Sequence, residues 1–241
     1  MKFRSRRILS ESTAPLAWGL GRAARLGKVP KPDTRVERFY YSEQRLMAAP
    51  IPKVASRTFK QMFQTLSDGA PSELACNPEE IRPQFPDFYI FSFTRNPWSR
   101  IYSCWKDKVA DAVTPGKVSI LSRFSGLRPF MPFEEFVEWL ATEAGSDSVA
   151  DRHWMSQVRH LDAGDGRSLC NFVGQMEQLD AGLSQVEQQT GIALPRPEKV
   201  NAKTAGGEYR TAFSERARQM IAERYAADIE TYKYRFDDEV H

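Results

Sequence analysis

The sequence predicts an α/β fold in which helices flank a parallel β-sheet. Short apolar runs at residues 45–50, 88–93 and 169–173 have the length of strands, and each precedes a segment with helical spacing. Strands separated by helices favour a parallel sheet with crossover connections. The first two runs also end in a polar turn with a cation and hydroxyl groups. Because backbone N–H groups at the start of a helix are unpaired, such turns are natural anion sites.

Size and charge set the first limits on function. The chain has 241 residues, is 41% hydrophobic and contains 15 Phe, 8 Tyr and 5 Trp, enough for one sizeable core. We expect a single domain over residues 36–241. The 34 basic and 31 acidic residues leave a net charge of +3, which does not require nucleic acid as a partner. Any preference for anions must therefore come from local clusters.

The cysteines and the hydropathy pattern indicate the compartment. Cys76, Cys104 and Cys170 are odd in number and widely spaced, so they match neither a disulfide framework nor a metal site. No run of about 18 apolar residues is present, so no membrane-spanning helix is expected. These features favour a reducing, cytoplasmic location and a site without a metal.

Residues 1–35 form a basic leader. It has a modest apolar patch at 15–26, and the cations in and around this patch include Arg4, Arg6, Arg7, Arg22, Arg25 and Lys28. One interpretation is peripheral contact with an anionic membrane surface. The other is a partly ordered, solvated segment that precedes the domain.

The first half of the domain follows from spacing and capping signals. After the strand at 45–50, a helix is expected over 56–67, with Phe59, Met62, Phe63 and Leu66 facing the core. Residues 68–87 are rich in Pro, Gly and Asn and predict a loop that can hold one helical turn. The strand at 88–93 leads to Asn96, a helix N-cap, and to Pro97 at the first helical position.

The second half is expected to be mostly helical. Residues 111–131, rich in Ser, Gly and basic side chains, predict a long, mobile connection of the kind that covers a substrate. Helices are expected over 132–143, 179–189 and 214–232, with a short one within 151–161. A strand at 169–173 and a loop at 195–207 complete the chain.

The first polar turn combines a cation with hydroxyl groups. Lys53 supplies a compact positive charge, while Ser56, Thr58 and backbone amides are oxyanion donors. The turn is not a glycine-rich nucleotide loop, because GxxxxGK[ST] is absent and residues 51–59 contain no glycine. The alternative is an ordinary strand-to-helix turn with a lysine on the surface.

The second polar turn places Arg95 eight residues before Ser103. A phosphate against the helix can contact both, with the guanidinium offering a planar fork of donors. The turn follows a buried strand, and ligands of open α/β sheets bind at the carboxyl ends of strands. The alternative is a surface arginine. Two such turns together suggest a ligand with two separate anionic groups.

These two segments resemble the carbohydrate sulfotransferases of sulfotransferase family 2. Residues 51–60, IPKVASRTFK, are similar to the family's phosphosulfate loop, and residues 93–108, FTRNPWSRIYSCWKDK, to its second signature. The similarity continues in the same order downstream, through residues 152–154, 172–179 (FVGQMEQL), 199–201 and 222–236. It thus covers roughly residues 45–236.

The resemblance implies a P-loop-NTPase-like fold and PAPS (3′-phosphoadenosine 5′-phosphosulfate) as the sulfate donor. The implied phosphosulfate ligands are Lys53, Ala55, Ser56, Arg57 and Thr58, and the implied 3′-phosphate ligands are Arg95 and Ser103. Arg57 stands where the family usually has a small hydroxyl residue, and it either adds charge to the site or turns outward. The membrane anchor and paired cysteines of Golgi members are missing, which favours a soluble, bacterial-type enzyme.

Sulfuryl transfer needs charge stabilisation on the leaving phosphate and a base for the acceptor proton. Lys53, with the helix N-terminus, serves the first need. For the base, His153 matches the family's His-Trp pair; His160 lies seven residues further on, and His241 is terminal. The alternative is a structural His153 that hydrogen-bonds within the fold. Glu177 is either a further candidate base or a buried structural carboxylate.

The acceptor stays open: the hydroxyl or amine of a carbohydrate, or another polar acceptor such as a lipid head group. Two other functions also remain. A small-molecule kinase needs a Walker-type loop and a magnesium-binding acidic residue after a strand, and neither is evident. A non-catalytic protein that binds anions or a membrane surface would explain the basic leader and both turns without chemistry.

Overall fold

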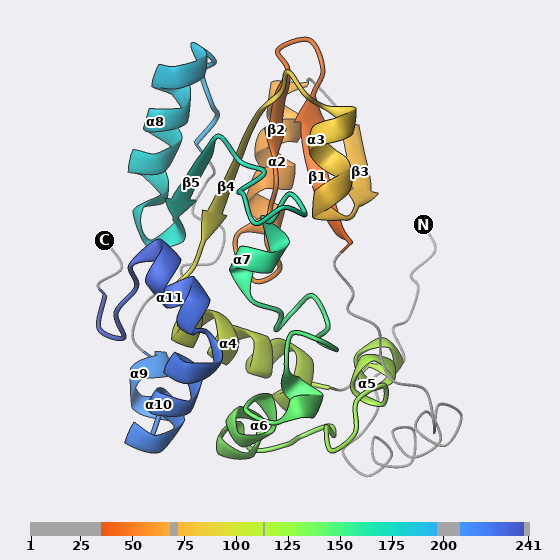
Figure 1. Cartoon of the computed structure of the whole chain (residues 1–241), viewed down its shortest axis with the longest axis vertical. Helices are drawn as coiled ribbons and strands as arrows, with labels where there is room; N and C mark the ends of the chain where they lie inside the picture. Colours follow the sequence, from red (N-terminus) through yellow and green to blue (C-terminus); the bar gives the residue numbers. More distant parts are fainter. Residues whose placement is uncertain (1–34, 68–71, 113, 197–207, 239–241) are drawn as a thin grey trace, which may run out of the picture.

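A five-stranded sheet in the order β3-β1-β2-β4-β5 organises the computed structural model, which describes residues 35–67, 72–112, 114–196 and 208–238 (Figure 1). The strands are β1 (Val36–Tyr41), β2 (Leu46–Ala48), β3 (Ser72–Cys76), β4 (Tyr89–Thr94) and β5 (Phe172–Gln175). β2, β4 and β5 run parallel, and the α/β fold predicted from the sequence is confirmed. The leader up to residue 34, residues 199–201 and His241 lie outside the described residues.

The sheet differs from the prediction at one side. β1 pairs antiparallel with both β2 and β3, so the sheet is parallel only over β2, β4 and β5. β3 lies within the segment 68–87 that was expected to be a loop. Its side chains are largely exposed, so it has no alternation of apolar and polar residues to reveal a strand. β1 was missed because Arg38, a charged residue, lies buried in its centre.

The helices that follow β2 and β4 lie where they were predicted. α2 (Ser56–Leu66) buries Phe59, Met62 and Phe63. α4 (Pro97–Trp105) begins at Asn96, whose side chain accepts hydrogen bonds from the backbone N–H groups of Trp98 and Ser99. A π-helical turn, η2 (Lys106–Ala110), continues α4. Both helices therefore follow neighbouring parallel strands, α2 after the segment 49–55 and α4 after residues 95–96.

The connection at 111–131 was predicted wrongly as a long, mobile loop. It contains α5 (Pro115–Leu121), and Leu121, Phe124 and Leu127 are buried. Phe124 packs edge-on against the rings of Trp139 and Trp154. Apolar residues three positions apart hold this segment in the core, although the polar residues between them dominate its composition.

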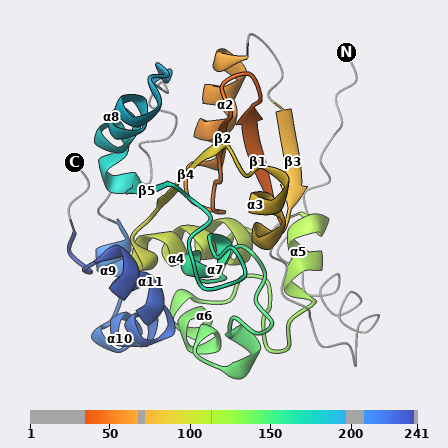
Figure 2. The ribbon, with the colours of Figure 1, turned by 45° about the horizontal axis from the view of Figure 1, so that its top comes forward.

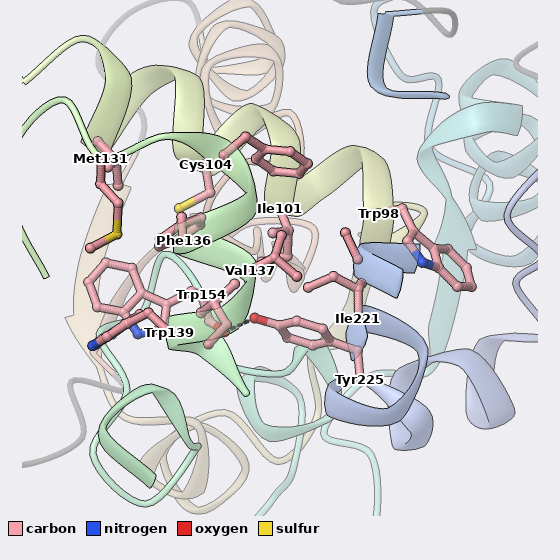
Figure 3. Packing of buried hydrophobic residues seen from close by; sticks show 14 of the residues in the cluster. Trp98, Ile101, Cys104, Met131, Phe136, Val137, Trp139, Trp154, Ile221 and Tyr225 are labelled. Atoms are coloured by element: carbon pink, nitrogen blue, oxygen red, sulfur yellow. Dashed lines mark hydrogen bonds between the residues drawn. The ribbon is translucent and has the colours of Figure 1, made fainter. Parts of the chain in front are cut away.

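The remaining helices complete the molecule. They are α3 (Ile81–Gln84), α6 (Phe133–Leu140), α7 (Gln157–His160), α8 (Leu179–Thr190), α9 (Glu208–Ala212), α10 (Glu215–Arg224) and α11 (Ala226–Tyr232), with 3₁₀ turns at Pro78–Glu80, Glu143–Gly145 and Met176–Gln178. The helix expected over 214–232 breaks at Tyr225. The buried hydroxyl of Tyr225 donates to the carbonyl of Trp154, which fixes the chain at the break (Figure 3). Within the described residues, no helix has the length and apolar character needed to span a membrane.

The core of the described residues consists of two hydrophobic clusters. One lies on the sheet and contains Phe59, Phe63, Phe91 and Phe93. The other is built by helices, and Figure 3 shows Trp98, Ile101, Trp139, Trp154 and Tyr225 within it. Figure 2 shows α4 and α7 beneath the same end of the sheet, with α6 and α10 beyond them. The segment that follows the carboxyl end of β2 contacts α4 through Arg100 and Pro52, and α4 itself follows β4.

Candidate active site

The turn after β2 has a strained backbone. Residues 51–54 form a tight turn in which the N–H of Val54 donates to the carbonyl of Ile51 at 2.9 Å. Lys53 has a φ of 70° and Ala55 a φ of 48°, both in the left-handed region that favours glycine. Such conformations cost on the order of 1–3 kcal/mol each and concentrate at functional sites. A loop without glycine thus adopts a shape that glycine-rich loops adopt freely.

The side chain of Lys53 reaches a cluster of charged side chains at the C-terminal end of α4. Its Nζ lies 3.1 Å from Oδ2 of Asp107, in η2. Nζ of Lys108 lies 3.2 Å from the same oxygen, and Nζ of Lys117, from α5, lies 3.4 Å from Oδ1. We call Lys53, Lys108 and Lys117 the lysine trio. Burial alone would raise the pKa of Asp107, but the ammonium groups of Lys53 and Lys108 outweigh it and hold this pKa below its ordinary value.

The turn after β4 contacts the first turn through Arg95. Nη1 of Arg95 donates to the carbonyl of Lys53 at 3.4 Å, while Nε and Nη2 donate to the hydroxyl of Ser99 at 3.1 and 2.8 Å. The backbone of Arg95 is held by Gln157, whose amide accepts from its N–H and donates to its carbonyl, both at 2.9 Å. Burial lowers the pKa of Arg95, and the nearby Glu177 carboxylate partly offsets this effect. The two predicted anion turns are therefore in direct contact.

The other implied donor ligands lie around these two turns. The hydroxyl of Ser56 donates to the carbonyl of Ile51 at 3.3 Å, and Thr58 follows in the first turn of α2. Ser103 is half-buried in α4. The side chain of Arg57 is exposed, which agrees with the outward of its two predicted orientations. Apart from Arg57, the residues singled out in the sequence are thus at least partly shielded from solvent.

His153 is paired with a buried carboxylate. Its Nδ1 lies 2.5 Å from Oδ1 of Asp151, and its backbone N–H donates to the same oxygen at 3.1 Å. Burial lowers the pKa of His153, and Asp151 partly restores it; the positive charge of Lys108 acts in the same direction as burial. The field of Lys108 thus reaches both Asp107 and His153. It connects the lysine trio electrostatically with the histidine.

His160 does not share the surroundings of His153. It is completely buried in α7, its Nε2 lies 2.9 Å from the carbonyl of Arg152, and its pKa is well below the ordinary value because of burial and the nearby Arg100 and Arg38. His153 lies in the turn before α7, so the two histidines are not on one helix. Glu177 accepts the N–H of Asn96 at 2.8 Å and the hydroxyl hydrogen of Tyr234 at 3.3 Å. These contacts make Glu177 a buried support for the start of α4.

Besides Asp107, sequence reasoning missed three residues that assemble the site. Arg100 is buried in α4 and donates to the carbonyls of Pro52, Met155 and Arg152 at 3.1, 2.8 and 3.5 Å, linking the first turn to the histidine turn. Arg38 donates to the carbonyl of Pro50 at 3.2 Å. Asp151 was detectable as a carboxylate two residues before a candidate base. Arg100 and Arg38 gave no such signal, because their partners are distant in sequence.

A hollow in the described part of the molecule lies away from these turns. It measures about 700 Å³ and is lined by Trp98, residues of α10 and residues 235–238. None of Lys53, Arg95 and His153 lines it. The geometry of the two turns, and not the size of a cavity, identifies the candidate site.

Parallel strands that each end in a cationic turn and continue into a helix define an α/β protein that binds anions at the carboxyl edge of its sheet. Residues 37–235 match the model of the sulfotransferase family. The match covers most of the chain, so the protein belongs to the sulfotransferase family and is a transferase enzyme. Neither the curated proteins nor the solved structures gave a match.

Proposed function

We propose that this enzyme transfers a sulfuryl group from PAPS to the hydroxyl or amine of a carbohydrate or another polar acceptor, such as a lipid head group. Membership of the sulfotransferase family supports sulfuryl transfer in general. The observation that carries the choice of donor is the contact between Arg95 and the carbonyl of Lys53. This contact joins two cationic turns at the ends of neighbouring strands, and PAPS has an anionic group for each.

The first turn supplies the phosphosulfate ligands in this proposal. Lys53 contributes charge, Ser56 and Thr58 contribute hydroxyl groups, and the left-handed Ala55 shapes the entry to α2, whose first amides are unpaired. Arg57, whose side chain is exposed and turned outward, is not among the ligands in this proposal. Arg95 and Ser103 bind the 3′-phosphate, with Ser99 holding the guanidinium in place.

The reaction requires one bond to form and one to break at sulfur. The acceptor oxygen or nitrogen attacks the sulfur atom, and the bond between sulfur and the bridging oxygen of the phosphate breaks. Lys53 and the N-terminus of α2 stabilise the charge that develops on the leaving phosphate. The acceptor proton passes to His153. Since Nδ1 of His153 faces the carboxylate of Asp151, Nδ1 carries the hydrogen and Nε2 is the basic nitrogen.

A calorimetric titration with PAPS and with ATP tests the donor. We expect PAPS to bind in the micromolar range, and Lys53→Ala and Arg95→Ala each to weaken it by about tenfold or more, which corresponds to about 1.4 kcal/mol. The matched control is Lys60→Ala, because Lys60 lies on α2 but pairs with Glu73 at 2.7 Å. Tighter binding of ATP than of PAPS, or equal affinities in all variants, contradicts the assignment.

A further inference from the structure

Three lysines from separate parts of the chain share one carboxylate. Lys53 and Lys108 contact Oδ2 of Asp107, and Lys117 contacts Oδ1, all within 3.4 Å. Their side chains are only 18%, 18% and 19% exposed, whereas Asp107 is 39% exposed. Like charges repel at such distances, and the repulsion grows as solvent is excluded. The cluster therefore needs an anion at its centre, and the protein supplies one.

The backbone brings this anion to the site by an irregular turn. Asp107 and Lys108 belong to η2, where the N–H of Asp111 donates to the carbonyl of Lys106 in place of regular α-helical pairing. Single π-helical turns inserted in α-helices occur frequently at functional sites. Here the turn places the carboxylate of Asp107 and the ammonium group of Lys108, which are adjacent in sequence, next to Lys53. Lys117 is anchored separately by Asp111, at 3.2 Å.

We propose that the carboxylate of Asp107 is a placeholder for the sulfuryl group of the donor. When PAPS binds, the sulfuryl group displaces Asp107, and Lys108 and Lys117 become donor ligands beside Lys53. This inference rests on the proposed function for the identity of the donor. A carboxylate offers two oxygens to three ammonium groups, so two lysines share one oxygen; a sulfuryl group has three free oxygens, one for each lysine. The partial exposure of Asp107 leaves it room to move away.

Replacement of the placeholder tests this inference. In Asp107→Asn the competing charge is gone, so we expect PAPS to bind about fivefold more tightly, in line with the modest strength of a partly exposed ion pair. Binding of PAP, the product without the sulfuryl group, should change by less than about twofold. Lys108→Ala and Lys117→Ala should each weaken PAPS binding by about fivefold and leave PAP unchanged.

Glu208→Gln is the matched control. Glu208 pairs at 2.7 Å with Lys106, which belongs to η2 but not to the lysine trio, so PAPS affinity should stay within about twofold of the wild type. The inference is overturned if Asp107→Asn leaves PAPS affinity unchanged, or weakens PAPS and PAP equally. If Asp107→Asn fails to fold, the two lysine variants decide, and equal effects on PAPS and PAP overturn the inference.

A separate arm distinguishes failure of the inference from failure of the proposed function. If the wild type binds neither PAPS nor PAP, the donor assignment is wrong, but the anion subsite remains testable with inorganic sulfate. Ligands that bind the folded state raise its melting temperature. Relative to chloride at equal ionic strength, sulfate should raise the melting temperature of Asp107→Asn more than that of the wild type and of Glu208→Gln. Equal increases in all three overturn the inference.

Discussion

The environment of His153 determines how it can act as a base. The carboxylate of Asp151 orients the ring through Nδ1, while burial and the field of Lys108 favour the neutral form. A neutral imidazole at neutral pH can accept a proton from the acceptor, so the proposed base is already in its active form. The lowered pKa also makes the imidazole of His153 a weaker base, and Asp151 partly offsets this effect.

The pH dependence of the reaction follows from the direction of this shift. Because the pKa of His153 lies below its ordinary value of 6.5, kcat/KM should be level near neutral pH and decrease only below pH 6.5. Asp151→Asn removes a group that raises this pKa, so the decrease should move to still lower pH. His153→Ala should lower kcat by about 10²–10⁴. A His153→Ala variant with the wild-type kcat would contradict the role of His153 as the base.

Individual site residues were predictable from the sequence when their signal was local. Lys53 and Arg95 each follow a buried strand and precede a helix, so a short segment indicated their position. Asp107 and Arg100 were missed because they act on partners 54 and 48 residues away. Those contacts arise from tertiary packing, and no pattern within one element encodes them.

The turn between β2 and α2 is the element on which the site depends most. Lys53 and Ala55 have left-handed backbone conformations. Two arginines from other elements hold the backbone next to them: Arg38 donates to the carbonyl of Pro50, and Arg100 donates to that of Pro52. Both arginines donate to backbone carbonyl oxygens. They act as buried donors that fix the backbone of the turn.

Substitution of Ala55 tests the conformation of this turn. A β-branched side chain is a severe outlier at a φ of 48°, so Ala55→Val should lower the free energy of unfolding by about 2 kcal/mol or more. Glycine adopts this φ freely, so Ala55→Gly should stay within about 1 kcal/mol of the wild type. Urea denaturation measures both values. Equal stabilities for the two variants would show that Ala55 does not have this conformation.

The sequence predicted whole elements well where caps and periodicity agreed. Asn96 and Pro97 indicated the start of α4, and the apolar residues of α2 gave its buried face. The exposed residues of β3 gave no strand signal, because this strand pairs only with β1 at the edge of the sheet. The segment around α5 was mistaken for a loop because buried Leu121 and Phe124 are separated by polar residues.

At the scale of the molecule, α4 and its continuation connect the donor site with the helical cluster. Arg95 precedes α4, Arg100 lies within it, and Asp107 follows it in η2. Residues before, within and after α4 thus contact the first turn. Arg95 and Arg100 donate to the carbonyls of Lys53 and Pro52, and Asp107 pairs with the side chain of Lys53. The histidine turn is held on the same helix through Met155. One helix therefore sets the position of the proposed donor ligands relative to the proposed base.

Transfer of labelled sulfate is the most direct test of the proposed function. The enzyme is incubated with PAPS carrying labelled sulfate and with a cell extract that supplies acceptors, in parallel with Lys53→Ala. We expect the wild type to release PAP and to form a labelled product with a hydroxyl or amine acceptor, and Lys53→Ala to form little or none. Labelled product in equal amounts from both proteins, or none from the wild type with any acceptor in the extract, would contradict PAPS-dependent sulfuryl transfer at this site.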